Sequence, residues 1–258
     1  VTALEVTVRG PNADLHSGIY GGSVDNPAMA LCQMLGALRN NKGRITVPDF
    51  YEGVEKLTAY ERKQMKRLPI NKAEYRKLVG VPELYGEKGY THHEQRSARP
   101  TLEINGLTSG YQGEGSKTIV PAWASAKITC RLVPNQNPRR INRAFREHLK
   151  KLCPSTVKIE IKEGHSAEAY YVSPTGPMAK VALEALHESF GSEPVLLREG
   201  GSIPIINEFK KVLGADSLLL GLALPDDNLH SPNEKFDLDC FHKGAQMSAL
   251  LWDKLADI

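Results

Sequence analysis

The chain has 258 residues, of which 41% are hydrophobic and 24% are charged, and its formal net charge is +3. This composition is typical of a globular protein with a sizeable core, and the small excess of positive charge argues against a nucleic-acid partner. Because no apolar run approaches the ~18 residues that a membrane-spanning helix needs, we also expect no membrane partner.

The cysteines show no Cys-x-x-Cys spacing and lie within apolar patterns. They are Cys32, Cys130, Cys153 and Cys240. Since disulfides are rare in reducing compartments, we expect buried free thiols and a cytoplasmic location. We expect no signal peptide. Because the chain opens with a valine close to a strand-like run, we expect it to be a portion of a longer protein.

The first elements follow a clear pattern. Residues 4–9 alternate between apolar and polar side chains, which predicts a half-buried strand. A glycine-rich loop over 12–22 follows it. The spacing of apolar residues then predicts a helix, with Asn26 as its N-cap and Pro27 at its first position, which ends at residues 40–43.

Residues 51–97 are polar and charged, and we interpret them as an excursion from the main sheet. They carry two weak helical patterns, near 58–67 and 72–79. The run His92-His93-Glu94 suggests a metal site, but neighbouring residues of an extended segment point to opposite sides. We therefore expect exposed loop histidines there.

The next segments complete a recognisable order of elements. Residues 101–107 and 122–133 are strand-like, 138–152 form an amphipathic helical pattern, and 156–162 alternate as a strand. The order strand, helix, strand, strand, helix, strand predicts a ferredoxin-like βαββαβ domain of the α+β class. Such a sheet carries both helices on one face and leaves an edge strand available.

After Gly164 the pattern changes to that of an α/β domain. We expect helices over 178–190, 203–213 and 238–255, and strands over 195–197 and 217–222. The last strand is a continuous apolar run, as in buried parallel sheets. We place the boundary within 163–173, which gives a first domain over 1–165 that includes the excursion 51–97, and a second over 166–258.

Four sites carry residue types suited to chemistry. His16 lies between glycines, where an imidazole can donate a hydrogen bond to an oxyanion, although a capping or surface histidine is the alternative. Arg131 shares one strand face with Lys127 and Thr129, and its guanidinium suits a carboxylate, although an exposed sheet arginine explains it too. The backbone N–H groups around Ser202, at a helix start, attract anions, whereas a plain turn is the alternative.

His230 follows the predicted buried strand and its loop. Loops at the carboxyl ends of strands are where α/β sheets bind ligands, although a lone histidine is more often structural.

Three stretches together resemble a known family. They are Asp-Leu-His-Ser-Gly-Ile-Tyr-Gly-Gly at 14–22, Arg-Glu-Gly-Gly-Ser-Ile-Pro at 198–204, and Asn-Leu-His-Ser-Pro-Asn-Glu at 228–234. They are similar to the M20 family of metallopeptidases, in its carnosine-dipeptidase-like (cytosolic non-specific dipeptidase) branch. The resemblance covers essentially the whole chain, as the back part of such an enzyme. It implies a lid and dimerisation domain over 1–165, followed by the C-terminal part of an α/β zinc-peptidase catalytic domain.

The resemblance also implies roles for single residues. It implies that His16 reaches the partner subunit's active site in a homodimer and stabilises the tetrahedral intermediate. It assigns substrate contacts to Thr118, Arg131 and Ser202, with Arg131 holding the C-terminal carboxylate of the peptide. His230 matches the last ligand of a centre of two divalent metal ions, zinc or manganese.

Two further residues have supporting roles in the expected site. Glu199 would help to order the site, and His165 would approach it from the domain junction to contact substrate.

The family supplies its other metal ligands and its general base from a front segment whose motifs are absent here, and the chain contains no Glu-Glu pair. His230 alone cannot hold a zinc ion, because zinc sites use at least three protein ligands. We therefore expect a parent metallodipeptidase that cleaves short peptides, and a chain that is inactive alone. The alternatives are an M20-type aminoacylase or desuccinylase and a non-catalytic dimerisation module. The preferred dipeptide and the native metal stay open.

Overall fold

The computed structural model describes residues 1–68, 71–172, 175–200, 203 and 205–256. The chain forms two compact units. Unit 1 comprises Val1–Arg62, Pro69–Tyr170 and Arg198–Pro204, and unit 2 comprises Lys63–Leu68, Tyr171–Leu197 and Ile205–Ile258.

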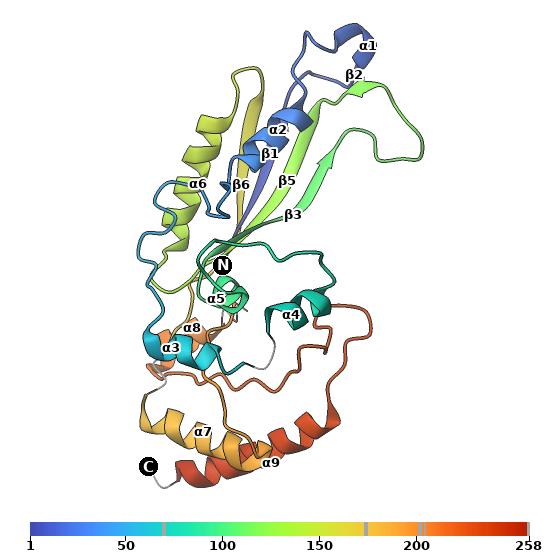
Figure 1. The fold of residues 1–258 in the computed structure, drawn as a ribbon. Coiled ribbons are helices and arrows are strands. Elements are labelled where there is room, and N and C mark those ends of the chain that lie inside the picture. Colours follow the sequence, from blue (N-terminus) through green and yellow to red (C-terminus); the bar gives the residue numbers. More distant parts are fainter. Residues whose placement is uncertain (69–70, 173–174, 201–202, 204, 257–258) are drawn as a thin grey trace. The chain divides into compact units, whose positions relative to one another are not determined.

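Unit 1 is built on a four-stranded sheet with the order β3-β5-β1-β6, in which all neighbours are antiparallel. Its strands are β1 (Thr2–Arg9), β3 (Thr101–Ser109), β5 (Trp123–Arg131) and β6 (Lys158–Ser166). Helix α2 (Pro27–Gly36) follows β1, and helix α6 (Pro138–Leu152) follows β5 (Figure 1). This sequence of elements and this strand order confirm the predicted ferredoxin-like arrangement.

The core of unit 1 lies between one face of the sheet and the two helices. Leu4, Val6 and Val8 of β1 are buried, whereas Glu5 between them and Arg9 after them are exposed, as the alternation predicts. Both helices contribute buried side chains to the same cluster, so they cover the same face. That cluster includes Leu31 and Met34 of α2, and Ile141, Phe145 and Leu149 of α6.

Each of these helices begins at an asparagine cap followed by proline. The side-chain Oδ1 of Asn26 accepts a hydrogen bond from the backbone N–H of Ala28 at 2.9 Å, and Pro27 occupies the first turn, as predicted. Asn137 caps α6 in the same way by accepting from the N–H of Arg140 at 3.1 Å.

The excursion 51–97 contains α3 (Ala59–Met65), α4 (Lys72–Val79) and α5 (His92–Ser97). The first two match the weak helical patterns. The expectation of exposed loop histidines is wrong, because His92 and His93 are half-buried within α5. Thr91 and Glu94 form a reciprocal capping box that starts this helix. The Thr-x-x-Glu spacing of this pair is a sequence signal for the start of a helix.

The glycine-rich loop after β1 contains structure that the sequence pattern does not predict. Leu15–His16 forms the two-residue strand β2, which pairs antiparallel with β4 (Ile119–Val120). One turn of helix, α1 (Ser17–Tyr20), follows β2 directly. Strands of two residues are too short for any periodicity, so only the fold reveals them.

Unit 2 contains α7 (Pro177–Phe190), α8 (Ile205–Leu213) and α9 (Leu238–Leu255), close to the predicted helices. Helices α7 and α9 pack against each other, with Lys254 Nζ 2.6 Å from Glu188 Oε1 (Figure 1). The strands expected over 195–197 and 217–222 are wrong: the structure assigns these residues to no strand, and Leu219 is exposed. An apolar run becomes a strand only beside a hydrogen-bonding partner, and no described segment pairs with this one.

Two remaining expectations concern thiols and membranes. All four cysteines are free. Burial holds for Cys130 and Cys240, but Cys153 is half-buried and Cys32 is exposed on α2, so the expectation of four buried thiols is wrong. Among the helices that the structure describes, none is long and apolar enough to cross a membrane.

Candidate functional site

His16 and Thr118 lie together at one end of the unit 1 sheet. Strand β2 pairs His16 with Ile119 of β4, and the backbone N–H of Ser17 donates to the carbonyl of Thr118 at 3.0 Å. The side chain of Asp14 ties the same loop to the sheet, since its Oδ1 accepts from the N–H of Ala122 at 2.9 Å. Two predicted site residues far apart in the sequence are therefore neighbours in the fold.

The imidazole of His16 is exposed and held in one orientation by its own loop. The backbone N–H of Gly18 donates to Nδ1 of His16 at 3.0 Å, so the imidazole caps α1. Because Nδ1 is the acceptor, the neutral ring carries its proton on Nε2. A Cβ at position 18 would lie 2.9 Å from Cε1 of His16, so a larger residue there would displace the imidazole from this orientation. The loop thus presents an N–H donor.

Arg131 lies at the other end of the sheet. It is the last residue of β5, opposite Thr101 of β3, and it is exposed on the face that the helices leave open. Lys127 and Thr129 share this face, as the alternation predicts. An exposed guanidinium there can receive a carboxylate in two parallel hydrogen bonds.

His165 lies in β6 near the same end as Arg131. Thr2 of β1 pairs with Ser166 on one side and with Cys130 on the other, so these three residues form one row across the sheet. A bulge in β6 places Gly164 and His165 opposite Ala3. The side chain of His165 is exposed.

The sheet separates these two groups of residues. Strand β5 runs for 9 residues from Trp123, at the His16 end, to Arg131. At ~3.3 Å per residue this is roughly 25 Å. In Figure 1, α1 and β2 lie at one end of the sheet and the N-terminus of β1 at the other. A dipeptide spans only about 7 Å, so His16 and Arg131 of one chain cannot contact the same dipeptide.

Gly201 and Ser202 of the Gly-Gly-Ser turn lie outside the described residues. Of the preceding residues, Glu199 accepts hydrogen bonds from Nη1 of Arg96 in α5, at 3.2 Å to each carboxylate oxygen. The N–H of Gly200 donates to Oε1 of Glu199 at 2.8 Å.

His230 lies in an exposed loop of unit 2 with an unusual backbone. Its φ angle is +62°, in the left-handed region, and its N–H donates to Glu234 Oε2 at 3.3 Å. The loop closes on Asp227, whose Oδ2 accepts from the N–H of Leu224 at 2.7 Å and whose Oδ1 lies 3.0 Å from Nζ of Lys235.

Asp227 is the residue of this loop that sequence reasoning undervalued. Its side chain is buried, and the hydrogen bond from Leu224, followed by that from Lys235, holds the pKa of its carboxyl below the ordinary value. From the sequence alone, Asp227 is interpreted as one of two ordinary loop acids, because nothing in the local pattern distinguishes it from Asp226. The structure shows that Asp227 ties the two sides of the His230 loop together.

A complete metal centre is not present in the described part of this chain. No three His, Cys, Asp or Glu side chains come together there in a group that could hold a metal ion. The acidic neighbour of His230 is Glu234. Even together, these two side chains would supply fewer than the three protein ligands that a zinc ion takes. These residues therefore do not fit a two-metal centre by themselves.

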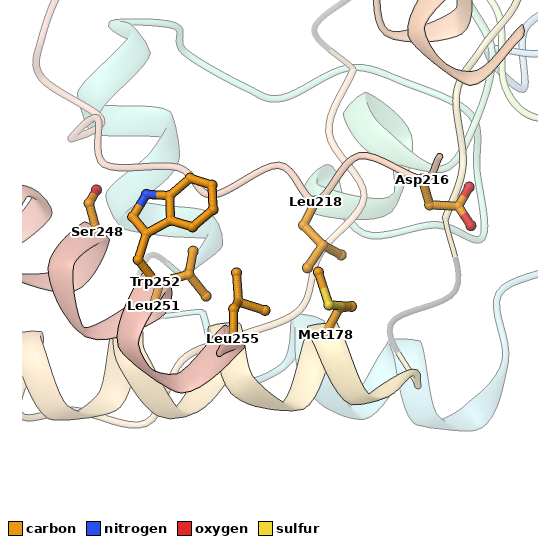
Figure 2. A pocket seen from close by; sticks show the side chains of 7 residues that line it. All are labelled: Met178, Asp216, Leu218, Ser248, Leu251, Trp252 and Leu255. Carbon is orange, nitrogen blue, oxygen red and sulfur yellow. The ribbon is translucent and has the colours of Figure 1, made fainter. Parts of the chain in front are cut away.

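A hollow of about 230 Å³ in unit 2 contains none of the predicted site residues (Figure 2). Aliphatic side chains from α7, α9 and the 216–218 segment dominate its wall. The lining residues are Met178, Asp216, Leu218, Ser248, Leu251, Trp252 and Leu255. The hollow lacks a histidine or a thiol, and its one carboxylate, on Asp216, lies 2.7 Å from Lys210 Nζ, so it has no evident catalytic chemistry.

Comparisons with known proteins bear on this arrangement. The M20 peptidase dimerisation domain matches residues 2–157. The Cys-Gly metallodipeptidase dug1 of Schizosaccharomyces pombe is 32% identical over 262 residues, which covers 100% of this chain and 55% of that protein. These findings confirm the resemblance on which the predicted fold rests.

Solved structures of related proteins support the same family resemblance. The di-peptidase Dug1p of Saccharomyces cerevisiae superposes with a TM-score of 0.87 at 30% identity, over 100% of this chain and 54% of that one. Human carnosine dipeptidase 1 gives a TM-score of 0.84 at 26% identity, over 100% and 55%. The chain thus spans about half the length of these proteins. It belongs to the M20 peptidase family, and residues 2–157 are its peptidase dimerisation domain.

Proposed function

We propose that this chain forms the lid and part of the catalytic domain of a homodimeric dipeptidase that hydrolyses short peptides. The observation that carries the proposal is the grouping of site residues at opposite ends of one sheet. His16 and Thr118 share one end, and Arg131 lies at the other. Such a sheet can serve two active sites, one in each subunit.

His16 is suited to stabilise the oxyanion that forms when the peptide carbonyl is attacked. Its Nδ1 accepts from Gly18, which leaves Nε2–H to donate. A donor fixed before reaction costs no reorganisation in the transition state, and removal of one such donor typically lowers kcat about 100- to 1,000-fold. We propose that His16 acts on the substrate bound by the partner subunit.

Thr118 and Arg131 position the substrate in this proposal, but in different active sites. Since Thr118 is a neighbour of His16, it joins His16 at the partner's site. Arg131 holds the terminal carboxylate of the peptide bound by its own subunit, and His165, near the same end of the sheet, approaches that peptide. Ser202 completes the substrate contacts; it lies outside the described residues.

We further propose that two divalent ions, zinc or manganese, activate water in the complete enzyme, with His230 as one ligand. The name metallodipeptidase of the relative from S. pombe supports a divalent cofactor. Because the described residues hold no group of three ligands, other polypeptide must supply the rest. The chain alone is therefore expected to be inactive.

The remaining parts of the proposal concern organisation and location. Residues 1–165 form the lid, 166–258 belong to the catalytic domain, and two lids pair in the dimer, which the match to a dimerisation domain supports. A cytoplasmic location is supported by the free cysteines.

A substrate panel tests this function. The protein made from its complete coding sequence should hydrolyse dipeptides, lose this activity to a chelator, and leave N-acyl-amino acids largely uncleaved. Preferred cleavage of acyl-amino acids would replace the dipeptidase with an aminoacylase or desuccinylase. No cleavage of either class, by a folded dimer supplied with zinc or manganese, would indicate a dimerisation module without chemistry.

A further inference from the structure

Three ion pairs join helix α3, helix α5 and residues 198–200 within unit 1. The pairs are Arg198–Glu61, Arg62–Glu94 and Arg96–Glu199. Because residues 61 and 62 are neighbours in α3, and 198 and 199 are neighbours in the chain, the three pairs close into a circuit. We call these six residues the ion-pair circuit. It links the excursion 51–97 to the segment that leads into the Gly-Gly-Ser turn.

The Arg198–Glu61 pair is the most enclosed part of the circuit. Nε and Nη2 of Arg198 both lie 2.7 Å from Oε1 of Glu61, and the two side chains are only 14% and 17% exposed. The other oxygen, Oε2, accepts from the N–H and the hydroxyl of Thr58 at 2.8 and 2.9 Å. Removal of one partner would leave a largely enclosed charge without its counter-ion, which is costly.

The second pair connects two helices of the excursion, α3 and α5. Nε of Arg62 donates to Oε1 of Glu94 at 3.1 Å, and Glu94 is buried. The other oxygen of Glu94 accepts from the N–H of Thr91 in the capping box. One carboxylate therefore starts α5 and joins it to α3.

The third contact brings the backbone of Gly200 against α5. Arg96 pairs with Glu199, and a Cβ at position 200 would lie 2.4 Å from the carbonyl oxygen of Arg96. Any larger residue there would force the segment away from the helix. Residues 198–200 belong to no helix or strand, and these side-chain contacts are among those that hold them.

We propose that the excursion 51–97 is a positioning element for the substrate-binding turn, and that Glu61 and Arg96 are its positioning residues. They fix Arg198, Glu199 and Gly200, which directly precede Gly201 and Ser202 in the sequence. The step from a fixed segment to substrate binding rests on the proposed function of Ser202. Sites held in place before the substrate arrives lose less conformational freedom on binding, and misplacement by about 1 Å is costly.

Hydrogen exchange of the 258-residue chain tests the fixing of the segment directly. Glu61→Gln and Arg96→Gln should each accelerate exchange in peptides covering 198–200, Glu61→Gln by roughly tenfold or more and Arg96→Gln by less, because the Arg96 pair is more exposed. Glu83→Gln is the matched control, because it removes the exposed Arg76–Glu83 pair of the same excursion without touching 198–200. If residues 198–200 exchanged at the same rate in Glu61→Gln, Arg96→Gln and Glu83→Gln, the proposal would be overturned.

Gly200→Ala provides a second variant that leaves every charge in place. It should accelerate exchange over the same residues because the added Cβ displaces the segment from Arg96. If Glu61→Gln unfolds unit 1, Arg96→Gln and Gly200→Ala still decide the matter, since unchanged exchange in both contradicts the proposal.

Kinetics on the protein made from its complete coding sequence tests the positioning role. Glu61→Gln should raise KM for a dipeptide about tenfold and lower kcat by less, whereas Glu83→Gln should change neither. Faster exchange with an unchanged KM would overturn positioning. If that protein cleaves no dipeptide even without substitution, the proposed function fails, and the exchange result still decides whether the circuit fixes the segment.

Discussion

The backbone carbonyl of Thr118 accepts a hydrogen bond from the N–H of Ser17 at 3.0 Å, which places Thr118 beside the loop that carries His16. This contact links the loop after β1 to the segment before β5. Its consequence is that any ligand reached by the imidazole of His16 is also close to Thr118. The two residues are therefore expected to work on the same substrate molecule.

Replacement of His16 tests the role of the Nε2–H donor. In the protein made from its complete coding sequence, His16→Ala should lower kcat for a dipeptide about 100- to 1,000-fold while Tm stays nearly unchanged, because the side chain is exposed. Ser23→Ala is the control in the same loop, since its hydroxyl donates a hydrogen bond to the backbone carbonyl of Tyr20. An equal loss in both variants would mean that loop folding, and not the donor, matters.

Truncation of Phe145 tests the core of unit 1. Phe145 is fully buried and makes an edge-to-face contact with Phe50, with ring centroids 5.9 Å apart. Phe145→Ala should lower the free energy of unfolding of unit 1 by about 3–5 kcal/mol in urea denaturation. Arg143→Ala, on the exposed side of α6, should change it by less than about 0.5 kcal/mol. Similar values for the two variants would contradict the assigned core.

Acid should weaken the Arg198–Glu61 pair. Partial burial raises the pKa of Glu61, but hydrogen bonds from Thr58 and Arg198 outweigh burial and hold the pKa below the ordinary value of 4.5. The unfolded chain then binds more protons, so the stability that Glu61 contributes is present above pH 4.5 and is lost as pH falls through the folded-state pKa. The stability difference from Glu61→Gln should shrink accordingly, and a constant difference from pH 7 to 3 would refute this account.

The cysteines should differ sharply in reactivity. Burial raises the pKa of the Cys130 thiol to about 12, so almost no thiolate is present at neutral pH, whereas Cys32 is exposed on α2. Iodoacetamide at pH 8 should label Cys32 in the folded chain and should label Cys130 only after unfolding, as peptide mass spectrometry would detect. Cys32→Ser serves as the control, and rapid native labelling of Cys130 would contradict its burial.

Elements with strong periodicity and clear caps could be predicted from the sequence. Helix α9 and helix α4 match the expected ranges, and α2 begins at Asn26 and Pro27 as expected. In these cases the apolar spacing and the capping side chains act locally, so neighbouring residues carry the information.

The parts that could not be predicted depend on partners distant in the sequence. Strands β2 and β4 are two residues each and exist only because the chain brings them together. The apolar run 217–222 indicates burial but forms no strand without a hydrogen-bonding neighbour. The Arg198–Glu61 pair likewise joins residues with no shared local pattern, so no local signal predicts the link between the excursion and the 198–200 segment.

Mixed dimers test most directly the claim that one sheet serves two active sites. His16→Ala and Arg131→Met chains, each from the complete coding sequence, should be nearly inactive alone. Their random mixture should regain about a quarter of normal dipeptidase activity, because half of the dimers are mixed and each mixed dimer has one intact site. His16→Ala mixed with Thr118→Val should regain nothing, since those residues share a site. No recovery in the first mixture, with mixed dimers shown by mass spectrometry, would contradict the account.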